Sequence, residues 1–170
     1  MKLNTKRLTI IPLNIEQFRV LLDGVGKLEK LLRLDNSNEK LDSHAKKAME
    51  ELFKECKKHK EKYLWYTNWQ IILNNRNLSI GSACFMGYCG SDETVEIGYG
   101  INEKYRCNGY MTEVVNSMCQ WALKDKKVLR IIAGTDKDNT ASQKVLKKCG
   151  FIIYDEDHEK YLWQLNDKLV

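Results

Sequence analysis

Two changes of hydrophobic period near the middle of this chain constrain its fold more than any other feature. Residues 94–101 (TVEIGYGI) alternate as a β-strand does, residues 109–126 carry apolar side chains at helical spacing, and residues 128–135 (VLRIIAGT) alternate again. A strand, a helix and a second strand in this order form a βαβ unit, in which the two strands run parallel. We therefore expect residues 94–101 and 128–135 to be parallel neighbours in one sheet.

Strands and helices are predicted on both sides of this unit. Further strands are expected at residues 7–13, 63–73 and 78–87, and a closing hairpin is expected at residues 151–165. Further helices are expected at residues 14–22 or slightly beyond, 43–63 and 139–150. This order predicts an α+β fold. Because the chain has one proline and no Gly/Ser-rich linker, we expect one domain over residues 1–170.

The composition argues against several classes of protein. No apolar run approaches the roughly 18 residues of a membrane-spanning helix, and the first residues lack the apolar core and cleavage site of a signal peptide. We therefore expect a cytoplasmic protein without a membrane partner. The net charge of +5 permits an anionic ligand, but it is too small and too dispersed to predict nucleic-acid binding. The lysine-rich segment 54–63 is interpreted as the solvated face of a helix.

The cysteines form no recognisable disulfide or metal-binding pattern. All six are scattered through core-like or helical sequence, no Cys-x-x-Cys pair occurs, and the three histidines are not spaced from cysteines as zinc ligands would be. We therefore expect free thiols and no metal site.

The loop that leads into the helix of the βαβ unit contains Arg106, Asn108 and Gly109. The first turn of a helix has free N–H groups and the positive end of the helix dipole, Gly109 permits close approach of a ligand, and Arg106 adds a charged donor. This combination suits a phosphate. A purely structural interpretation is equally compatible with the loop alone: Asn108 caps the helix and Gly109 relieves a tight turn.

A second polar junction follows the second strand of the unit. The segment NTASQKVLKKCGF begins a helix at Asn139 and carries Ser142 one turn further on, so that both polar groups can point toward the same end of the sheet. The structural alternative is again helix capping, with the apolar residues of the segment facing the core.

Taken together, VEIGYGINEKYRCNGYMTEVV and NTASQKVLKKCGF resemble the GNAT superfamily of acyl-CoA-dependent N-acetyltransferases, particularly the branch of ribosomal-protein-alanine N-acetyltransferases. The first segment carries the family's Arg/Gln-x-x-Gly-x-Gly/Ala loop, and the second carries Asn-x-x-Ser followed by Gly-Phe. The resemblance covers residues 63–165, with a weaker likeness at LNTKRLTIIPL. It implies a three-layer fold with a twisted mixed sheet, whose two central parallel strands splay apart to admit the pantetheine arm of acetyl-CoA.

The resemblance also implies which residues would bind acetyl-CoA. Backbone groups of Tyr99, Gly100 and Ile101 would pair with the pantetheine like an added strand, and Asn139 would lie along the arm. N–H groups of the loop would hold the pyrophosphate. The loop residues are Arg106, Cys107, Asn108, Gly109, Tyr110 and Met111. The loop departs from the family pattern where Met111 replaces a usually small residue and Cys107 replaces a frequent glycine.

Acetyl transfer to an amine requires a group that removes the amine proton and a group that protonates the departing thiolate. We predict Glu96 as the base, directly or through water, because strand alternation places it on the face of Gly98 and Gly100, where missing side chains leave room for substrate. Burial would favour this role, and a surface carboxylate is the alternative. The resemblance implies that Ser142 lies beside the sulfur, as candidate acid or hydrogen-bond donor, although it also fits a solvent-facing position. Tyr154 is a second candidate acid.

Other groups are candidates for a supporting role or for an alternative mechanism. A main-chain N–H within residues 99–101 is a candidate to polarise the acetyl carbonyl. An acyl-cysteine at Cys107 or Cys149 is disfavoured because no histidine lies nearby in the sequence. The aromatic run LWYTNW is interpreted as core, with Trp65 or Trp69 as alternative wall residues of an acceptor cleft.

The predicted function is direct transfer of an acetyl group from acetyl-CoA to a primary amine, on a protein N-terminus or on a small molecule. A noncatalytic acyl-CoA-binding or sensing module is the alternative, since it would share the fold and the cofactor site. A nucleic-acid-binding α+β domain is a third class, and the sequence offers it no continuous basic groove. The expected partners are acetyl-CoA and an amine acceptor, with monomer and homodimer both left open.

Overall fold

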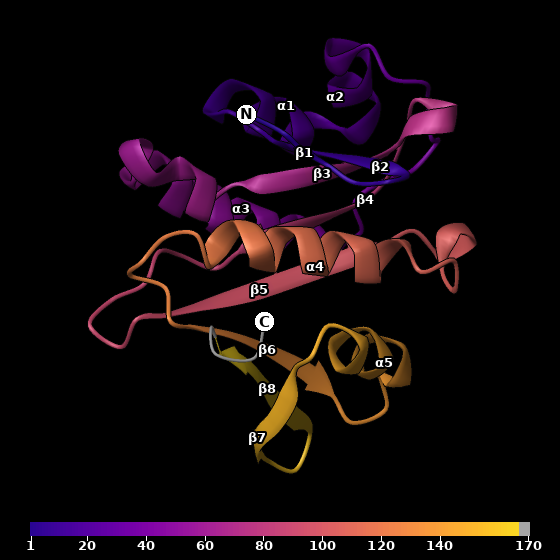
Figure 1. Ribbon diagram of the computed structural model, residues 1–170. Helices are drawn as coiled ribbons and strands as arrows, with labels where there is room; N and C mark the ends of the chain where they lie inside the picture. The colour runs from indigo at the N-terminus through magenta and orange to yellow at the C-terminus, as the bar shows by residue number, and fades with distance from the viewer. Residues whose placement is uncertain (167–170) are drawn as a thin grey trace.

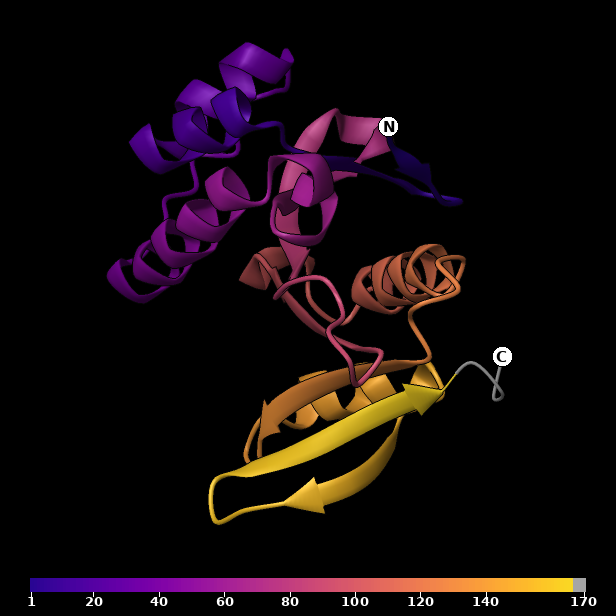
Figure 2. The same ribbon diagram turned by 90° about the vertical axis from the view of Figure 1, so that its left-hand side faces the viewer.

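The computed structural model describes residues 1–166 and contains one mixed sheet with helices on both faces (Figures 1 and 2). The strand order is β1-β2-β3-β4-β5-β6-β8-β7. The strands are β1 (Leu3–Asn4), β2 (Leu8–Pro12), β3 (Asn68–Leu73), β4 (Leu78–Phe85), β5 (Thr94–Ile101), β6 (Arg130–Asp136), β7 (Ile152–Glu156) and β8 (Lys160–Asn166). The helices are α1 (Ile15–Asp23), α2 (Val25–Leu32), α3 (Ser43–Lys58), α4 (Tyr110–Ala122) and α5 (Thr140–Lys148).

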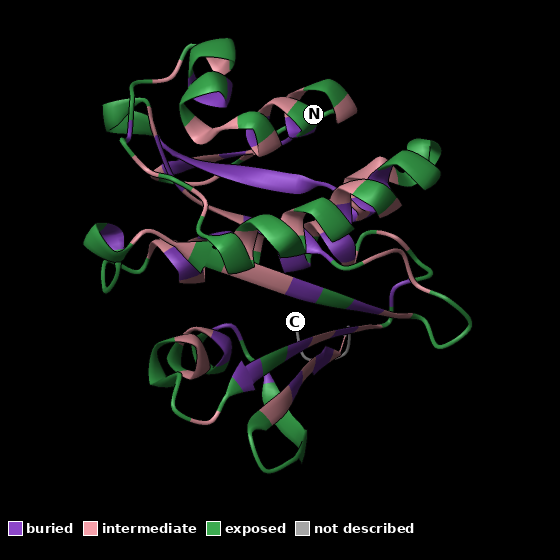
Figure 3. Cartoon of the chain, turned by 180° about the vertical axis from the view of Figure 1, so that it is seen from behind, coloured by how far each residue is buried: buried purple, intermediate pink, exposed green. Residues whose placement is uncertain are grey.

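The helices and the sheet make three layers, as predicted for this α+β fold. The apolar faces of α1, α2 and α3 pack over the N-terminal half of the sheet, where Phe18, Leu28 and Cys84 belong to one buried cluster. Helices α4 and α5 cover the opposite face, and a larger cluster there includes Trp69 and Trp163. Burial is unequal across the sheet, because β3 is buried along its whole length whereas β7 is exposed at every residue (Figure 3).

The predicted parallel pairing of β5 and β6 is confirmed, and it is short. Only three residue pairs join the two strands, and the last of them pairs Glu96 with Ile132. Beyond this point β5 continues beside β4 as far as Ile101, while β6 continues beside β8 as far as Asp136. The two central strands therefore separate after Glu96, which is the splayed arrangement expected from the sequence.

The structure differs from the predicted helices and strands mainly at their ends. The strand expected at residues 63–73 begins only at Asn68, because Lys60–Trp65 forms a 3₁₀ helix whose Trp65 ring packs against Trp121. Helix α3 ends at Lys58, before the predicted boundary, and the helix expected at residues 14–22 is followed by a separate helix, α2. The short strand β1 was not predicted, because its two residues show no periodicity.

Several simpler expectations are confirmed. The closing segment forms the antiparallel hairpin β7–β8, and all six cysteines are free thiols. The lysines of residues 54–63 are exposed, as a solvated helix face requires. Within residues 1–166, no helix combines the length and the apolar character needed to cross a bilayer.

Candidate active site

The site is built where β5 and β6 separate, and the hydrogen bonds of β5 determine which of its peptide groups are open. The carbonyl of Glu96 accepts a hydrogen bond from the N–H of Met86 (2.9 Å), and the N–H of Asn102 donates to the carbonyl of Ile80 (2.9 Å). The peptide groups of even-numbered residues on β5 therefore face β4. Because successive peptide groups of a strand point to opposite sides, those of odd-numbered residues face β6.

Among the strands of residues 1–166, none pairs with this second side of β5 beyond Glu96. The N–H and C=O groups of Tyr99 and Ile101 consequently face the gap, as is needed to pair with an extended ligand. Gly100 was expected to pair in the same way, and its peptide groups instead face β4. Gly100 contributes space, because a Cβ atom there would meet no other atom within 4 Å.

Helix α4 begins at the open end of this gap, and no side chain in the described part of the chain caps it. Its N-cap is Gly109, with φ of 76°, a left-handed conformation that glycine adopts readily. The Asn108 side chain does not cap the helix: α4 has Gly109 as its N-cap and no side-chain cap bond among the described residues, and the Asn108 amide nitrogen donates to the carbonyls of Tyr105 (3.2 Å) and Arg106 (2.8 Å). The structural interpretation in which Asn108 caps α4 is therefore wrong. The N–H groups of the first turn are left without a capping side chain, in the arrangement that suits a phosphate.

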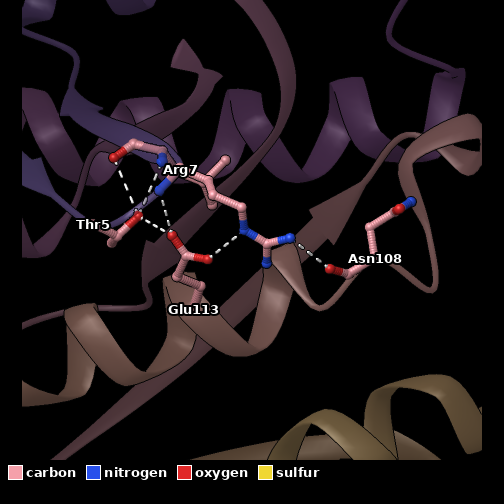
Figure 4. A network of polar contacts seen from close by, with 5 residues as sticks. Thr5, Arg7, Asn108 and Glu113 are labelled. Atoms are coloured by element: carbon pink, nitrogen blue, oxygen red, sulfur yellow. Dashed lines mark hydrogen bonds and ion pairs between the residues drawn. The ribbon is translucent and has the colours of Figure 1, made fainter. Parts of the chain in front are cut away.

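A network from the turn between β1 and β2 holds this loop in place (Figure 4). The Glu113 carboxylate accepts hydrogen bonds from the Thr5 hydroxyl, from the Arg7 N–H (2.9 Å) and from Arg7 Nε (2.9 Å). Arg7 Nη1 then donates to the carbonyl of Asn108 (3.0 Å). Partial burial acts to raise the pKa of Glu113, but the bonds from Thr5 and Arg7 outweigh it and lower that pKa. We call Thr5, Arg7 and Glu113 the loop brace.

Sequence reasoning missed the loop brace. Arg7 and Glu113 are separated by 106 positions, so no local pattern connects them. The available signal was the weak family likeness of LNTKRLTIIPL, which contains both Thr5 and Arg7.

The remaining loop residues fall into two groups. Arg106 is exposed, and within residues 1–166 its guanidinium makes no hydrogen bond or ion pair. Cys107 is also exposed and has φ of 62°, which explains why glycine is suited to this position. The Met111 side chain is 6% exposed and belongs to the main core, so this departure from the family pattern does not fill the loop.

Glu96 lies at the last residue pair before the strands separate, on the face of Gly98 and Gly100. The prediction of a shared face holds, but the Glu96 side chain is exposed rather than buried. It lies beside Cys84, where burial, helped by the charge of Glu96, raises the pKa of the thiol to about 12. The space above Gly98 is narrower than expected, because a Cβ there would come within 2.8 Å of the Met86 methyl.

Ser142 meets a partner that the sequence did not suggest. Its hydroxyl lies 2.8 Å from the hydroxyl of Tyr99, which reaches across from β5 to α5. The Ser142 N–H donates to Asn139 Oδ1 (3.1 Å), so the capping interpretation of Asn139 is confirmed. Burial raises the pKa of Tyr99 to about 12. Tyr154 is exposed on the edge strand β7, with its ring 5.9 Å from the Arg130 guanidinium.

The aromatic run also lies apart from the gap. Trp65 and Trp69 are 7% and 0% exposed and pack against Trp121 in the main core. Their interpretation as core residues is confirmed, and the alternative in which they line an acceptor cleft is wrong.

The mixed sheet opens between two parallel strands and has an uncapped helix N-terminus at the open end, which is the arrangement that the resemblance to acyl-CoA-dependent transferases implies. The chain matches the acetyltransferase (GNAT) domain over residues 7–152 and belongs to that family. It is 33% identical over 98 residues to the uncharacterized N-acetyltransferase YjdG of Bacillus subtilis, an alignment that covers 58% of each chain. The chain thus spans about half the length of the curated relatives it matches.

Solved structures share the fold over nearly the whole chain. A GNAT-family acetyltransferase from Bacillus anthracis has a TM-score of 0.67 at 22% identity and covers 99% of both chains. RimL, a ribosomal L7/L12 alpha-N-protein acetyltransferase solved in complex with coenzyme A, has a TM-score of 0.70 at 16% identity and covers 98% of both chains. At these identities the likeness establishes the fold.

Proposed function

We propose that this chain is an acetyl-CoA-dependent N-acetyltransferase that transfers the acetyl group directly to a primary amine. The observation that carries the proposal is the separation of β5 from β6 after Glu96, with open peptide groups of Tyr99 and Ile101 along the gap. Family membership and relatives named as N-acetyltransferases favour an enzyme over a noncatalytic sensing module. Residues 1–170 act as one domain in this proposal.

The cofactor-binding residues divide between the arm and the pyrophosphate of acetyl-CoA. The N–H and C=O groups of Tyr99 and Ile101 bind the pantetheine, and Gly100 leaves room for it. The pyrophosphate lies against the first turn of α4, where backbone N–H groups and the helix dipole favour an anion. Residues 106–111 form this part of the site, with Arg106 adding a charge-assisted bond. Asn139 contributes by fixing the first turn of α5 beside the arm.

The proposed catalytic residues lie on opposite faces of the sheet. Glu96 and the two glycines open onto one face, and Tyr99 and Ser142 lie on the face covered by α4 and α5. The acceptor amine approaches from the Glu96 face. Because the Glu96 carboxylate is exposed, it receives the amine proton through water, and an N–H within residues 99–101 stabilises the charge that develops on the acetyl oxygen. On the other face, the Ser142 hydroxyl donates a hydrogen bond to the departing sulfur.

The acceptor is proposed to be the primary amine of a protein N-terminus or of a small molecule. RimL, which shares the fold, is described as acting on a protein α-amino group. Neither acetyl-CoA nor the acceptor requires a metal in this reaction scheme, because direct transfer uses only proton-carrying groups and backbone donors.

The test is release of free CoA thiol when acetyl-CoA is supplied with a panel of amines: N-terminal peptides, amino acids, polyamines and aminoglycosides. We expect sustained, amine-dependent release with at least one acceptor. Glu96→Gln should lower kcat about 100-fold, which is a usual magnitude for loss of a general base. Glu93→Gln, a change of an exposed carboxylate just before β5, is the matched control and should leave kcat unchanged. Saturable CoA binding without thiol release on any amine would favour the sensing module.

A further inference from the structure

One contact crosses the gap between the separated strands. The Tyr99 hydroxyl, from β5, lies 2.8 Å from Ser142 Oγ and 3.4 Å from the Ser142 carbonyl, both on α5. Tyr99 is three residues beyond Glu96 along β5, and its side chain points to the opposite face. The two hydroxyls therefore meet on the face of β5 that α5 covers, opposite to Glu96.

The protonation state of this pair is set by its surroundings. Burial raises the pKa of Tyr99 to about 12, so the phenol remains protonated at neutral pH. A partly buried phenol needs a hydrogen-bond partner, and Ser142 Oγ offers two lone pairs and one hydrogen of its own. If Tyr99 donates to Oγ, the hydrogen of Ser142 remains free to point into the gap.

Without such a partner, the hydroxyl of a serine in the first turn of a helix can adopt other orientations. Its hydroxyl commonly bonds back to a carbonyl of the preceding turn or turns to solvent. The bond that the Ser142 N–H donates to Asn139 Oδ1 fixes the Ser142 backbone but leaves its hydroxyl free to rotate. Tyr99 is the side chain whose hydroxyl holds Oγ at the gap.

We propose that Tyr99 is a positioning residue that acts through Ser142: its hydroxyl donates to Ser142 Oγ, so that the Ser142 hydrogen points at the sulfur of the departing CoA. The inference rests on the function proposed above. As the new C–N bond forms, the C–S bond breaks and its electron pair goes to sulfur, where Ser142 stabilises the negative charge by a hydrogen bond. Ser142 and Tyr99 both keep their protons. The proton that finally neutralises the thiolate is the one lost by the amine, carried by Glu96 and water.

The test is a double-mutant cycle with Tyr99→Phe, Ser142→Ala and the double variant, measured as kcat at saturating acetyl-CoA. We expect each single variant to lower kcat about tenfold, as loss of one transition-state hydrogen bond does, with the KM for acetyl-CoA within about twofold of wild type. The double variant should be no slower than Ser142→Ala, because Tyr99 acts only through Ser142.

Tyr88→Phe is the matched control, since it removes another partly buried tyrosine hydroxyl, bonded to Asp125 at 2.9 Å. It should lower the melting temperature to a similar extent and leave kcat unchanged. A wild-type kcat in Tyr99→Phe, or losses that multiply in the double variant, would overturn the proposal. If wild-type protein released no thiol with any amine, the proposed function itself would fail, and the two failures are thus distinguishable.

Discussion

The N-termini of α4 and α5 lie at the same end of the sheet and are stabilised in different ways. Helix α5 is closed by its own Asn139, whose side chain occupies the N–H of Ser142. Helix α4 starts at Gly109 without a side-chain cap, and the loop before it is held from outside by Arg7 and Glu113. A capping side chain occupies N–H groups of the first turn, so these groups are no longer free to bind a ligand. A brace from outside the helix holds the turn in place and leaves the same N–H groups open.

Among changes at these two helix N-termini, breaking the loop brace at α4 is expected to have the largest effect. Arg7→Met removes the Nε bond to the Glu113 carboxylate and the Nη1 bond to the Asn108 carbonyl, so the loop loses its side-chain link to the brace. We expect the KM for acetyl-CoA to rise about tenfold while kcat changes less than twofold, since preorganised binding is lost and the chemistry is not touched. Steady-state kinetics well below the melting temperature measure both constants.

Lys6→Met is the control for this prediction, because it removes the neighbouring exposed positive charge without touching the brace. An unchanged KM in Arg7→Met, accompanied by a lower melting temperature, would mean that the brace serves stability alone.

A smaller effect is expected from removing the cap of α5. Asn139→Ala leaves the Ser142 N–H without its side-chain partner and should lower the free energy of unfolding by about 1 kcal/mol. The affinity for CoA should change less than in Arg7→Met, because this N-terminus is already closed to anions. Denaturant unfolding measures the change in stability, and CoA titration measures the change in affinity. If Asn139→Ala lost more free energy of CoA binding than free energy of unfolding, the N-terminus of α5, and not that of α4, would be the one that binds the anion.

The smallest expected effect is a pH dependence carried by Glu113. Its folded-state pKa lies below the ordinary value of about 4.3, so its contribution to stability is present above that value and is lost as the pH falls through the folded pKa. Glu113→Gln should therefore be less stable than wild type at pH 7, and the difference should shrink toward pH 3. Unfolding free energies of both proteins across this range test the sign, and a difference that grew on acidification would contradict it.

Local periodicity in the sequence predicts the elements of the fold correctly where it determines the structure. The alternation of residues 94–101, the helical spacing after Gly109 and the capping residue Asn139 all appear in the structure as elements of the predicted type. The strand prediction was wrong at residues 63–65, where a 3₁₀ helix stands in place of the expected extended chain and Trp65 packs against Trp121.

The site was predictable only in part, for a similar reason. Spacing placed Glu96 with Gly98 and Gly100, and the motifs located the loop at α4. The contacts of Arg7 with Glu113 and of Tyr99 with Ser142 join residues 106 and 43 positions apart, and they depend on strand register and helix packing. No short pattern encodes them.

The most direct test of the account compares CoA with pantetheine, which lacks the pyrophosphate, by titration into ¹⁵N-labelled protein. The account predicts that the amide resonances of Tyr110 and Met111 at the start of α4 shift strongly with CoA and little with pantetheine. Amides of Thr140 and Ala141 at the start of α5 should respond alike to both ligands. A CoA-specific shift at α5 that leaves the first turn of α4 unmoved would contradict the claim that the uncapped helix holds the pyrophosphate.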